Sequence, residues 1–386
     1  QEPSYSSLCF SSHVCLKMPI ANEDVNALAE NLRAPITERH KPAIDAIVSH
    51  VWKELPKAHD GQLRIVHGVK GGSLFKGTAM RGKFDVDLIF LLDLPARKLD
   101  DEGFQSQLKG SLVKCLENHG EIVMVDARAG VPFPSVSCSL FGIGFDIALG
   151  VDLVKGRVVK DRWKNQLRAA QQQILKCPGY YKAIILSRAL SASVSEACVV
   201  AVQQESDVVK LAIVLLKHWR DFNSLKMFKS FYAEGLALCA VDELRRKSIE
   251  NPQMTVLSIF TRVLQLLDLS EATARAPRYL TLEFLGLYDP ADWEGWYPDP
   301  EQSGHGHRII LVNPMTPILD ALHSVSVQAL RGWSEAARDT LGRLGDGSAS
   351  MEDLFGVGPS GGMSLEPAGE VFERAPGAWA ADKFRQ

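Results

Sequence analysis

The chain has 386 residues, of which 46% are hydrophobic and 23% are charged, as is ordinary for a soluble globular enzyme. This length exceeds what one small core supports and suits two lobes. A formal net charge of −3 excludes the global positive field of a basic nucleic-acid-binding domain, so any basic groove must be local. No apolar run reaches ~18 residues, so we expect no membrane-spanning segment.

The first half of the chain alternates between helical and strand patterns. Each segment was assigned from hydrophobic periodicity and from the glycines that bound it. We predict a helix over 41–55, a strand over 62–69, a central strand over 85–92, a helix over 102–120, and strands over 121–127 and 135–149.

The second half favours helices, and its end has little periodicity. We predict helices over 160–176, 206–222, 230–247 and 252–269, then a polar and aromatic loop over 286–306. The end is rich in Gly, Ser and Pro and is expected to be disordered. The predicted organisation is an unstructured leader 1–21, a mixed α/β lobe 22–155, a helical lobe 156–341 and a disordered tail 342–386.

The chain ends and the cysteines indicate a cellular compartment. The N-terminus is a poor secretory signal, and we interpret residues 1–17, before the first methionine, as a fragment end or untranslated leader. The seven cysteines are dispersed and form no C-x-x-C pair, which is typical of free thiols. We therefore expect a cytoplasmic protein.

Two carboxylates stand at the start of the apolar run "DVDLIFLL". In a strand, Asp85 and Asp87 project from the same face with Cα atoms about 6.5 to 7 Å apart. They can converge on a pair of divalent cations ~3.5 to 4 Å apart, which would neutralise their repulsion. The alternative is a solvated strand end with two ordinary acids, and an isolated D-x-D would favour that interpretation.

The glycine turn upstream favours the metal-binding interpretation over the solvated strand end. Gly71, Gly72 and Ser73 follow a predicted strand, and such a turn lets backbone N–H groups and a hydroxyl approach phosphate oxygens. "GSLFKGT" is not a P-loop, because Lys76 precedes Gly77 and the lysine after the glycine is missing. A phosphate-cradling turn beside a metal-binding D-x-D strand is the layout of a nucleotidyltransferase.

A nucleotidyltransferase site needs a third carboxylate from a neighbouring strand. In "GFDIALGVDL", alternation places Asp146 on the face opposite Phe145 and Ile147. Asp152 is the second choice, because it follows Gly150 and is expected in a turn. We therefore predict Asp146 as the third metal ligand.

The stretch 71–92 resembles the active-site stretch of the 2′-5′-oligoadenylate synthetases. In that family GGS, K-G-T, R-G and D-x-D-L recur at this spacing. The resemblance continues through "GFDIAL" and "LLKHW" and extends in weaker form to "RIILVNPMTP" and "GW", so that it covers residues 40–340. It implies a two-lobe α/β (α+β) nucleotidyltransferase fold, similar to cyclic GMP-AMP synthases and poly(A) polymerases.

The resemblance also implies roles for individual residues. Asp85, Asp87 and Asp146 would hold two Mg²⁺ ions, with Mn²⁺ as an alternative. Gly72 and Ser73 would contact the donor triphosphate, Lys217 would reach its phosphates, and Tyr232 would pack on the donor base. Without the resemblance, Lys217 is better explained as a snorkelling lysine near a helix end, and Tyr232 could equally be a core residue.

The implied reaction is the template-independent joining of ATP, as both donor and acceptor, through 2′-5′ bonds with release of pyrophosphate. In cells it would serve innate immune and antiviral signalling. One alternative is a synthase of cyclic dinucleotides or other oligonucleotides. Another is a catalytically dead RNA or protein sensor, against which the intact aspartates argue.

The chain departs from the family at several positions. Val214 replaces an arginine near the phosphates, and Phe231 replaces a glutamine beside the predicted base-packing tyrosine. Val199, Gln203 and Asp207 align with the region of basic double-stranded-RNA contacts. Because these side chains cannot make an electrostatic RNA footprint, we predict weak or absent activation by double-stranded RNA.

Overall fold

A computed structural model describes residues 20–37, 40–83, 86–127, 133–155, 160–247, 254–269, 278–282, 285–298, 309–322, 324–346 and 349–356. Asp85, the leader up to residue 19 and the end of the chain from 357 lie outside the described residues. The predictions for those positions therefore stay predictions.

The described residues form a five-stranded mixed sheet in the order β1-β2-β5-β4-β3. β2 and β5 pair in parallel, and the other neighbours pair antiparallel. The strand predicted over 135–149 is two strands joined by a tight turn, in which Phe141 and Gly142 both have positive φ. The strands are β1 (Ile65–Gly71), β2 (Val86–Leu92), β3 (Val123–Ala127), β4 (Ser135–Leu140) and β5 (Ile143–Val151).

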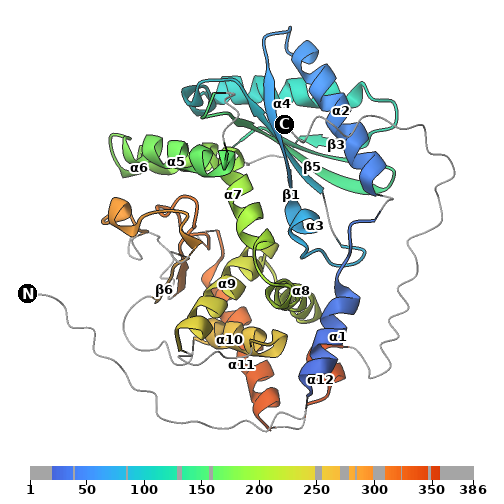
Figure 1. The fold of residues 1–386 in the computed structure, drawn as a ribbon, viewed down its shortest axis with the longest axis vertical. Helices are drawn as coiled ribbons and strands as arrows, with labels where there is room; N and C mark the ends of the chain where they lie inside the picture. The colour runs from blue at the N-terminus through green and yellow to red at the C-terminus, as the bar shows by residue number, and fades with distance from the viewer. Residues whose placement is uncertain are drawn as a thin grey trace, which may run out of the picture.

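Helices cover both faces of this sheet (Figure 1). α2 (His40–Ala58) and α4 (Glu102–Glu117) share a buried core with Leu88, Phe90 and Ile147. The alternate residues Ile89 and Leu91 face α7 (Ser191–Gln203) on the opposite side. β2 is therefore buried on both faces, as its apolar run predicts.

A second core lies in the helical lobe, shown below the sheet in Figure 1. The central helix α8 (Asp207–Phe222) contributes the fully buried Trp219, as its apolar pattern predicts. Its neighbours are α1 (Asn22–Leu32), α9 (Ser230–Lys247), α10 (Val256–Leu267), α11 (Val327–Asp346), α12 (Met351–Phe355) and a parallel pair of strands, β6 (Arg278–Leu280) and β7 (Ile309–Leu311).

The lobes do not follow the chain order as simply as predicted. α1 precedes the sheet in sequence, but its Val25 and Ala29 pack in the core of the helical lobe. α5 (Arg162–Leu175), α6 (Tyr180–Ala189) and α7 were assigned to the helical lobe, but their buried residues join the core of the sheet lobe. Hydrophobic periodicity shows that a helix buries one face, but not against which partner.

Helical structure also continues beyond residue 342, where the disordered tail was predicted to begin. α11 runs to Asp346, and α12 starts with a capping box at Ser350. Leu354 and Phe355 are buried, and the Phe355 carbonyl accepts a hydrogen bond from His218. Leu354 and Phe355 thus anchor the short helix α12 in the core, although the sequence on either side of it is polar.

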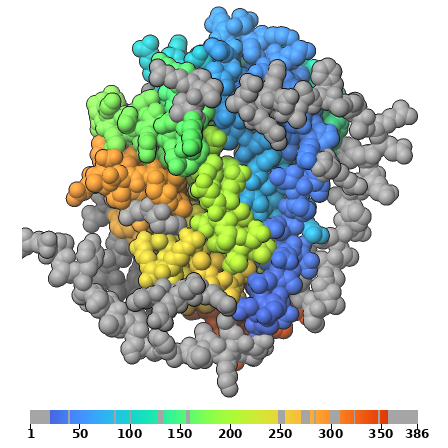
Figure 2. Space-filling view, in the orientation of Figure 1, coloured from blue at the N-terminus to red at the C-terminus, as the bar shows by residue number. Residues whose placement is uncertain are grey.

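Three short helical segments complete the described structure: α3 (Gly72–Lys76), η1 (Ala96–Asp100) and η4 (Pro290–Trp293). Across the described ranges, no single helix has the length and apolarity to cross a membrane. The pair α6 and α7, bent by 68°, passes that test only when the two are taken together. Figure 2 shows one face of α7 at the surface between the two lobes.

Candidate active site

Asp87 and Asp146 lie side by side on neighbouring parallel strands. The register of β2 and β5 pairs them directly, so their side chains leave the same face of the sheet. Adjacent strands are about 4.8 Å apart, which is close enough for both carboxylates to contact one ion or a pair of ions. Whether they do so remains a prediction.

The two aspartates are partly exposed, in contrast to most residues of their strands. Within β2, Asp87 is the only residue that is not fully buried, and Asp146 is likewise partly exposed in β5. Further along the same face, Ile89 and Leu91 are covered by Ala192 of α7. The sequence places its charges at the position where the apolar cover stops.

Ser137 of β4 continues this arrangement on the far side of Asp146. The β4–β5 register pairs the two residues, and the Ser137 hydroxyl donates a 2.8 Å hydrogen bond to Asp146 Oδ1. The neighbouring Cys138 points to the opposite face, where burial, together with the charge of Asp146, raises its pKa to about 12. The Cys138 side chain therefore lies in the buried core, away from the face that carries the aspartates.

The donor set at this site fits a hard divalent cation. Carboxylate oxygens are the ligands that Mg²⁺ prefers, and two of them face the same side here. Among the described residues no group of three or more His, Cys, Asp or Glu side chains could hold a metal ion. The other predicted ligand, Asp85, lies outside that part of the chain.

The glycine turn lies next to Asp87. Gly71, the last residue of β1, pairs with Asp87, and a Cβ on Gly71 would lie 3.4 Å from the Cβ of Asp87. Gly72 has φ +78°, a conformation that favours glycine, and it begins α3. The two glycines thus turn the chain away from the sheet immediately beside the carboxylate, and Ser73 follows in the first turn of α3.

A buried ionic cluster joins the two lobes just beyond this turn. Glu234 of α9 accepts from Lys76 of α3 at 2.8 Å and from Lys217 of α8 at 3.4 Å. Lys217 also donates to the Thr78 carbonyl at 3.0 Å and to its hydroxyl at 3.2 Å. The cluster therefore ties the segment that follows the glycine turn to two helices of the helical lobe.

The pKa values in this cluster follow from burial and pairing. Burial lowers the pKa of Lys217 to about 8, and the nearby Lys76 lowers it too, against the attraction of Glu234. Burial would also lower the pKa of Lys76, but Glu234 holds it above its usual value. Burial alone would raise the pKa of Glu234, but the two lysines hold it below its usual value.

The phosphate role of Lys217 stays a prediction, and the structure shows the surroundings of its side chain. The side chain is 2% exposed, and its ammonium group is engaged with Thr78 and Glu234. It is not a snorkelling lysine, because it lies inside the lobe contact. In this structure Lys217 holds Thr78, two residues after the end of α3.

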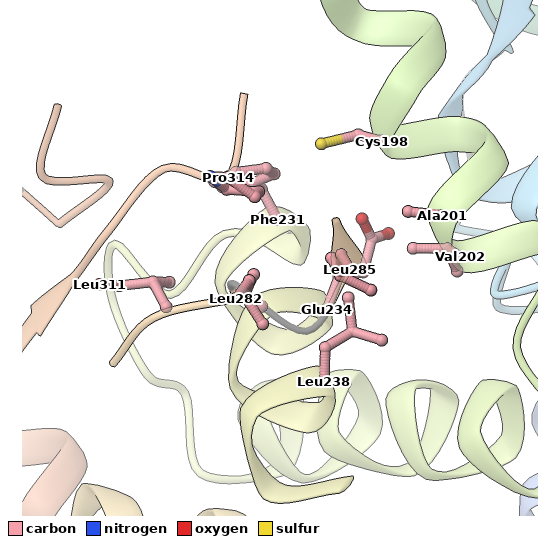
Figure 3. A pocket seen from close by; sticks show the side chains of 11 residues that line it. Cys198, Ala201, Val202, Phe231, Glu234, Leu238, Leu282, Leu285, Leu311 and Pro314 are labelled. Carbon is pink, nitrogen blue, oxygen red and sulfur yellow. The ribbon is translucent and has the colours of Figure 1, made fainter. Parts of the chain in front are cut away.

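A small cavity of about 20 Å³ lies beside the cluster, between α7 and α9 (Figure 3). It has room for about one water molecule. Glu234 of α9 and Cys198 of α7 bring its polar atoms, and the other lining residues are Ala201, Val202, Phe231, Gly235, Leu238, Leu282, Leu285, Leu311 and Pro314. The lining of this cavity is thus predominantly apolar.

Phe231, rather than Tyr232, faces this cavity. Tyr232 is 3% exposed, its ring lies 5.9 Å from that of Trp333, and its hydroxyl is 3.4 Å from Ser324. Successive residues on a helix point about 100° apart, so only one of the two can face the cavity. The structure therefore places Tyr232 in the core of the helical lobe, which was the alternative weighed from the sequence.

Asp152 is far from the paired aspartates. It follows the end of β5, six residues beyond Asp146, which is about 20 Å along an extended strand. Its buried carboxylate pairs with Arg162 at 2.6 Å. Asp152 is therefore a structural residue, and removing it would leave a largely buried guanidinium group without this partner.

The positions aligned with RNA contacts have different environments. Val199 is 5% exposed in α7, so this valine offers little surface to a ligand. Gln203 donates to the Phe75 carbonyl, and Asp207 pairs with Arg33 at 3.1 Å. Val214, aligned with a family arginine, is fully buried.

Glu234, Thr78 and Ser137 are the site residues that the sequence reasoning missed. Ser137 had a recognisable signal, because "SVSCS" alternates serines with apolar residues in a strand. Glu234 had only a weak one, a lone acid within the apolar pattern of "YAEGLAL". Its two lysine partners are distant in sequence, and nothing local predicts the contact.

No protein-family model matches the sequence, and no curated protein matches it either. Solved structures are similar in fold. They include the Cid1 poly(U) polymerase with MgGTP bound (TM-score 0.51, 11% identity, covering 87% of this chain and 97% of that chain). A cytoplasmic RNA terminal U-transferase has a TM-score of 0.50 at 14% identity, with coverage of 86% and 97%. E. coli MS115-1 CdnC with ATP has a TM-score of 0.50 at 14% identity, with coverage of 88% and 98%.

These similarities show that the chain has the two-lobe nucleotidyltransferase fold expected from its sequence. The mixed sheet carries the paired aspartates, and the helices of the second lobe lie across from it. At such low identity the resemblance covers the fold, and substrates have to be argued from the site.

Proposed function

We propose that the chain is a template-independent nucleotidyltransferase that makes 2′-5′-linked oligoadenylates from ATP and releases pyrophosphate. The observation that carries the proposal is the pairing of Asp87 with Asp146 beside the Gly71–Ser73 turn in a nucleotidyltransferase fold. The choice of ATP and of the 2′-5′ linkage rests on the resemblance of residues 71–92 to the synthetases.

The residues have distinct parts in this reaction. Asp85, Asp87 and Asp146 would hold two Mg²⁺ ions, which, when bound, activate the acceptor hydroxyl and stabilise the charge on the phosphates. The backbone of Gly72 and the hydroxyl of Ser73 would hold the donor triphosphate. The acceptor 2′-oxygen, having lost its proton, bonds to the α-phosphorus, and the bond to the bridging oxygen of pyrophosphate breaks.

Two supporting roles in this proposal differ from those that the resemblance implies. Base packing falls to Phe231, whose ring lines the cavity between α7 and α9. The adenine would enter only after the lobes separate by a few ångströms, because the cavity measures about 20 Å³. Lys217 acts indirectly, by fixing Thr78 and the loop after Ser73.

A different nucleotide product is the second candidate. The structures with this fold include CdnC solved with ATP and Cid1 solved with MgGTP. Among the residues that line the cavity, Glu234 and Cys198 have polar side chains, and Glu234 is held by two lysines. Few groups remain to read a base edge, so some incorporation of GTP is expected alongside ATP.

The test is incubation of the pure protein with ATP and Mg²⁺, with Asp146→Asn as the inactive control. Linear oligoadenylates that resist a 3′-5′-specific nuclease would support the proposal. Sensitive or cyclic products would replace it with the second candidate. Absence of any product, with nucleotide binding retained, would indicate a catalytically dead sensor.

We also propose where this activity would operate. The dispersed cysteines favour a reducing compartment, and Cys115, Cys138 and Cys198 are free thiols. A cytoplasmic oligoadenylate synthase would produce a second messenger for antiviral defence. Measuring oligoadenylates in cells that express the wild type or Asp146→Asn would test this role.

A further inference from the structure

Asp87 and Asp146 belong to a row of aligned residues that extends onto the neighbouring strands of the sheet. The registers of neighbouring strands align one residue from each strand across the whole sheet. In spatial order this row is Gly71, Asp87, Asp146, Ser137 and Asp126. Its members face the same side, so Ser137 is the residue next to the second aspartate.

The Ser137 hydroxyl can fix the orientation of the Asp146 carboxylate. The terminal torsion of an aspartate is broad and roughly two-fold, so the carboxylate rotates unless a partner restrains it. Ser137 donates its single proton to Oδ1 at 2.8 Å, from a neighbouring strand whose position is set by the sheet. A donor prefers to lie near the plane of the carboxylate that accepts its hydrogen bond. The hydrogen bond to Oδ1 therefore favours one orientation of the Asp146 carboxylate, and with it one position of the second oxygen.

β4 carries a matched serine that makes no such contact. Ser135 is two residues away on the same strand and points to the same face, where it pairs with Ala148. Its hydroxyl is buried and has no hydrogen-bond partner among the described residues. Ser135 and Ser137 thus differ in the contact with Asp146, while strand, face and side chain are the same.

We infer that Ser137 is a positioning residue for Asp146, which holds the carboxylate in the orientation that binds a divalent cation. The inference rests on the proposed function insofar as Asp146 is a metal ligand. It does not depend on which nucleotide is used or which linkage is made. Partners that orient metal ligands typically contribute about 10- to 100-fold in metal affinity or activity.

The experiment compares full-length wild type, Ser137→Ala, Ser137→Thr, Ser135→Ala and Asp146→Asn. Equilibrium Mn²⁺ binding is measured by the electron paramagnetic resonance signal of free Mn²⁺, with a non-hydrolysable ATP analogue present. We expect Ser137→Ala to weaken Mn²⁺ binding about 10-fold and to lower kcat in parallel with little change in KM for ATP. Threonine keeps the hydroxyl and suits a strand, so Ser137→Thr should stay within about three-fold of wild type.

Ser135→Ala is the control for the loss of a serine hydroxyl from β4 and should bind Mn²⁺ like wild type. Equal weakening in Ser135→Ala and Ser137→Ala would overturn the inference, because it would show a general effect on the strand. Unchanged Mn²⁺ affinity in Ser137→Ala, or failure of Ser137→Thr to restore it, would overturn it as well.

The proposed function and this inference can fail separately. If Ser137→Ala weakens Mn²⁺ binding but the products are not 2′-5′ oligoadenylates, the function is wrong and the positioning role stands. If wild type binds Mn²⁺ no better than Asp146→Asn, both the metal site and the role of Ser137 are wrong. If oligoadenylates form while Ser137→Ala behaves like wild type, only the positioning role is wrong.

Discussion

Two clusters of charged side chains lie close together in this molecule, and they differ in how they combine their charges. Asp87 and Asp146 bring like charges side by side at a partly exposed strand end. Lys76, Glu234 and Lys217 combine opposite charges in a buried contact between the lobes. Lys76 links the two groups, because the charge of Asp87 contributes to its raised pKa.

This difference separates a pair of like charges, which we propose binds a cation, from a cluster in which opposite charges meet. Adjacent carboxylates repel one another, and a divalent cation between them removes that cost. In the buried cluster the charges are compensated within the chain, so it can hold the lobes together without a ligand. The predictions below test whether the aspartate pair acts in catalysis and the lysine–glutamate cluster in architecture.

The largest expected effect is on catalysis. Replacing Asp87 or Asp146 by alanine, and Asp85 likewise, should lower the rate of synthesis at least about a thousandfold, or about 4 kcal/mol of transition-state stabilisation. Folding, followed by circular dichroism, should persist. Asp126→Asn is the matched control, because this exposed acid lies in the same row two strands away from the pair. Retained turnover in Asp146→Ala would refute the choice of this ligand.

The largest expected effect on stability comes from the buried cluster. Glu234→Gln leaves two buried lysines without their carboxylate and should lower the free energy of unfolding in urea by about 3 to 5 kcal/mol. Asp339→Asn removes an exposed helical ion pair with Arg343 and should change it little. Similar effects of the two variants would mean that the cluster does not hold the lobes together.

Phe231 and Tyr232 should differ in their effects on KM for ATP. Phe231→Ala removes the ring proposed to stack on the base and should raise KM for ATP about thirty-fold, at the middle of the about 1 to 3 kcal/mol typical of stacking. Tyr232→Phe loses one long hydrogen bond in the core and should leave KM unchanged. The reverse pattern in steady-state kinetics would restore the role predicted for Tyr232 from the sequence.

A smaller effect should appear in the pH dependence of stability. The pKa of Lys217 is about 8 in the folded protein, below its ordinary 10.5. Between these values the unfolded chain binds more protons, so this group makes the free energy of unfolding rise with pH. Relative to Lys217→Met, wild type should gain at most about 1 kcal/mol per pH unit from pH 8 to 9.5. Parallel stability curves for the two proteins would contradict this.

The smallest expected effect is that of double-stranded RNA. The aligned positions offer a buried valine, a glutamine bonded to the backbone and an aspartate paired with Arg33. These groups give RNA little differential affinity for a closed cleft, so the rate should change by less than about three-fold. A large, length-dependent stimulation would show that RNA binds at another surface, with the basic residues of α2 as the first place to look.

Local patterns in the sequence determined much of this protein. The two-residue period of the strands predicted a mixed α/β lobe. The side-by-side projection of Asp85 and Asp87 stays a prediction, because Asp85 lies outside the described residues. The apolar pattern around Trp219 predicted a buried central helix. Such features depend on side-chain spacing within one element, which the chain alone dictates. Even the choice of Asp146 came from alternation within a single strand, and its role as a ligand stays a prediction.

Contacts between distant elements were decided by the tertiary structure. The register that joins Asp87 to Asp146 and Ser137 arises from strand pairing. The burial of Lys217 against Glu234 arises from the packing of helices across the lobe contact. Which of Phe231 and Tyr232 meets the cavity depends on a rotation of about 100° around a helix that is apolar on more than one side. Periodicity predicts that such a helix is buried, but only its packed neighbours decide which side chain faces the site.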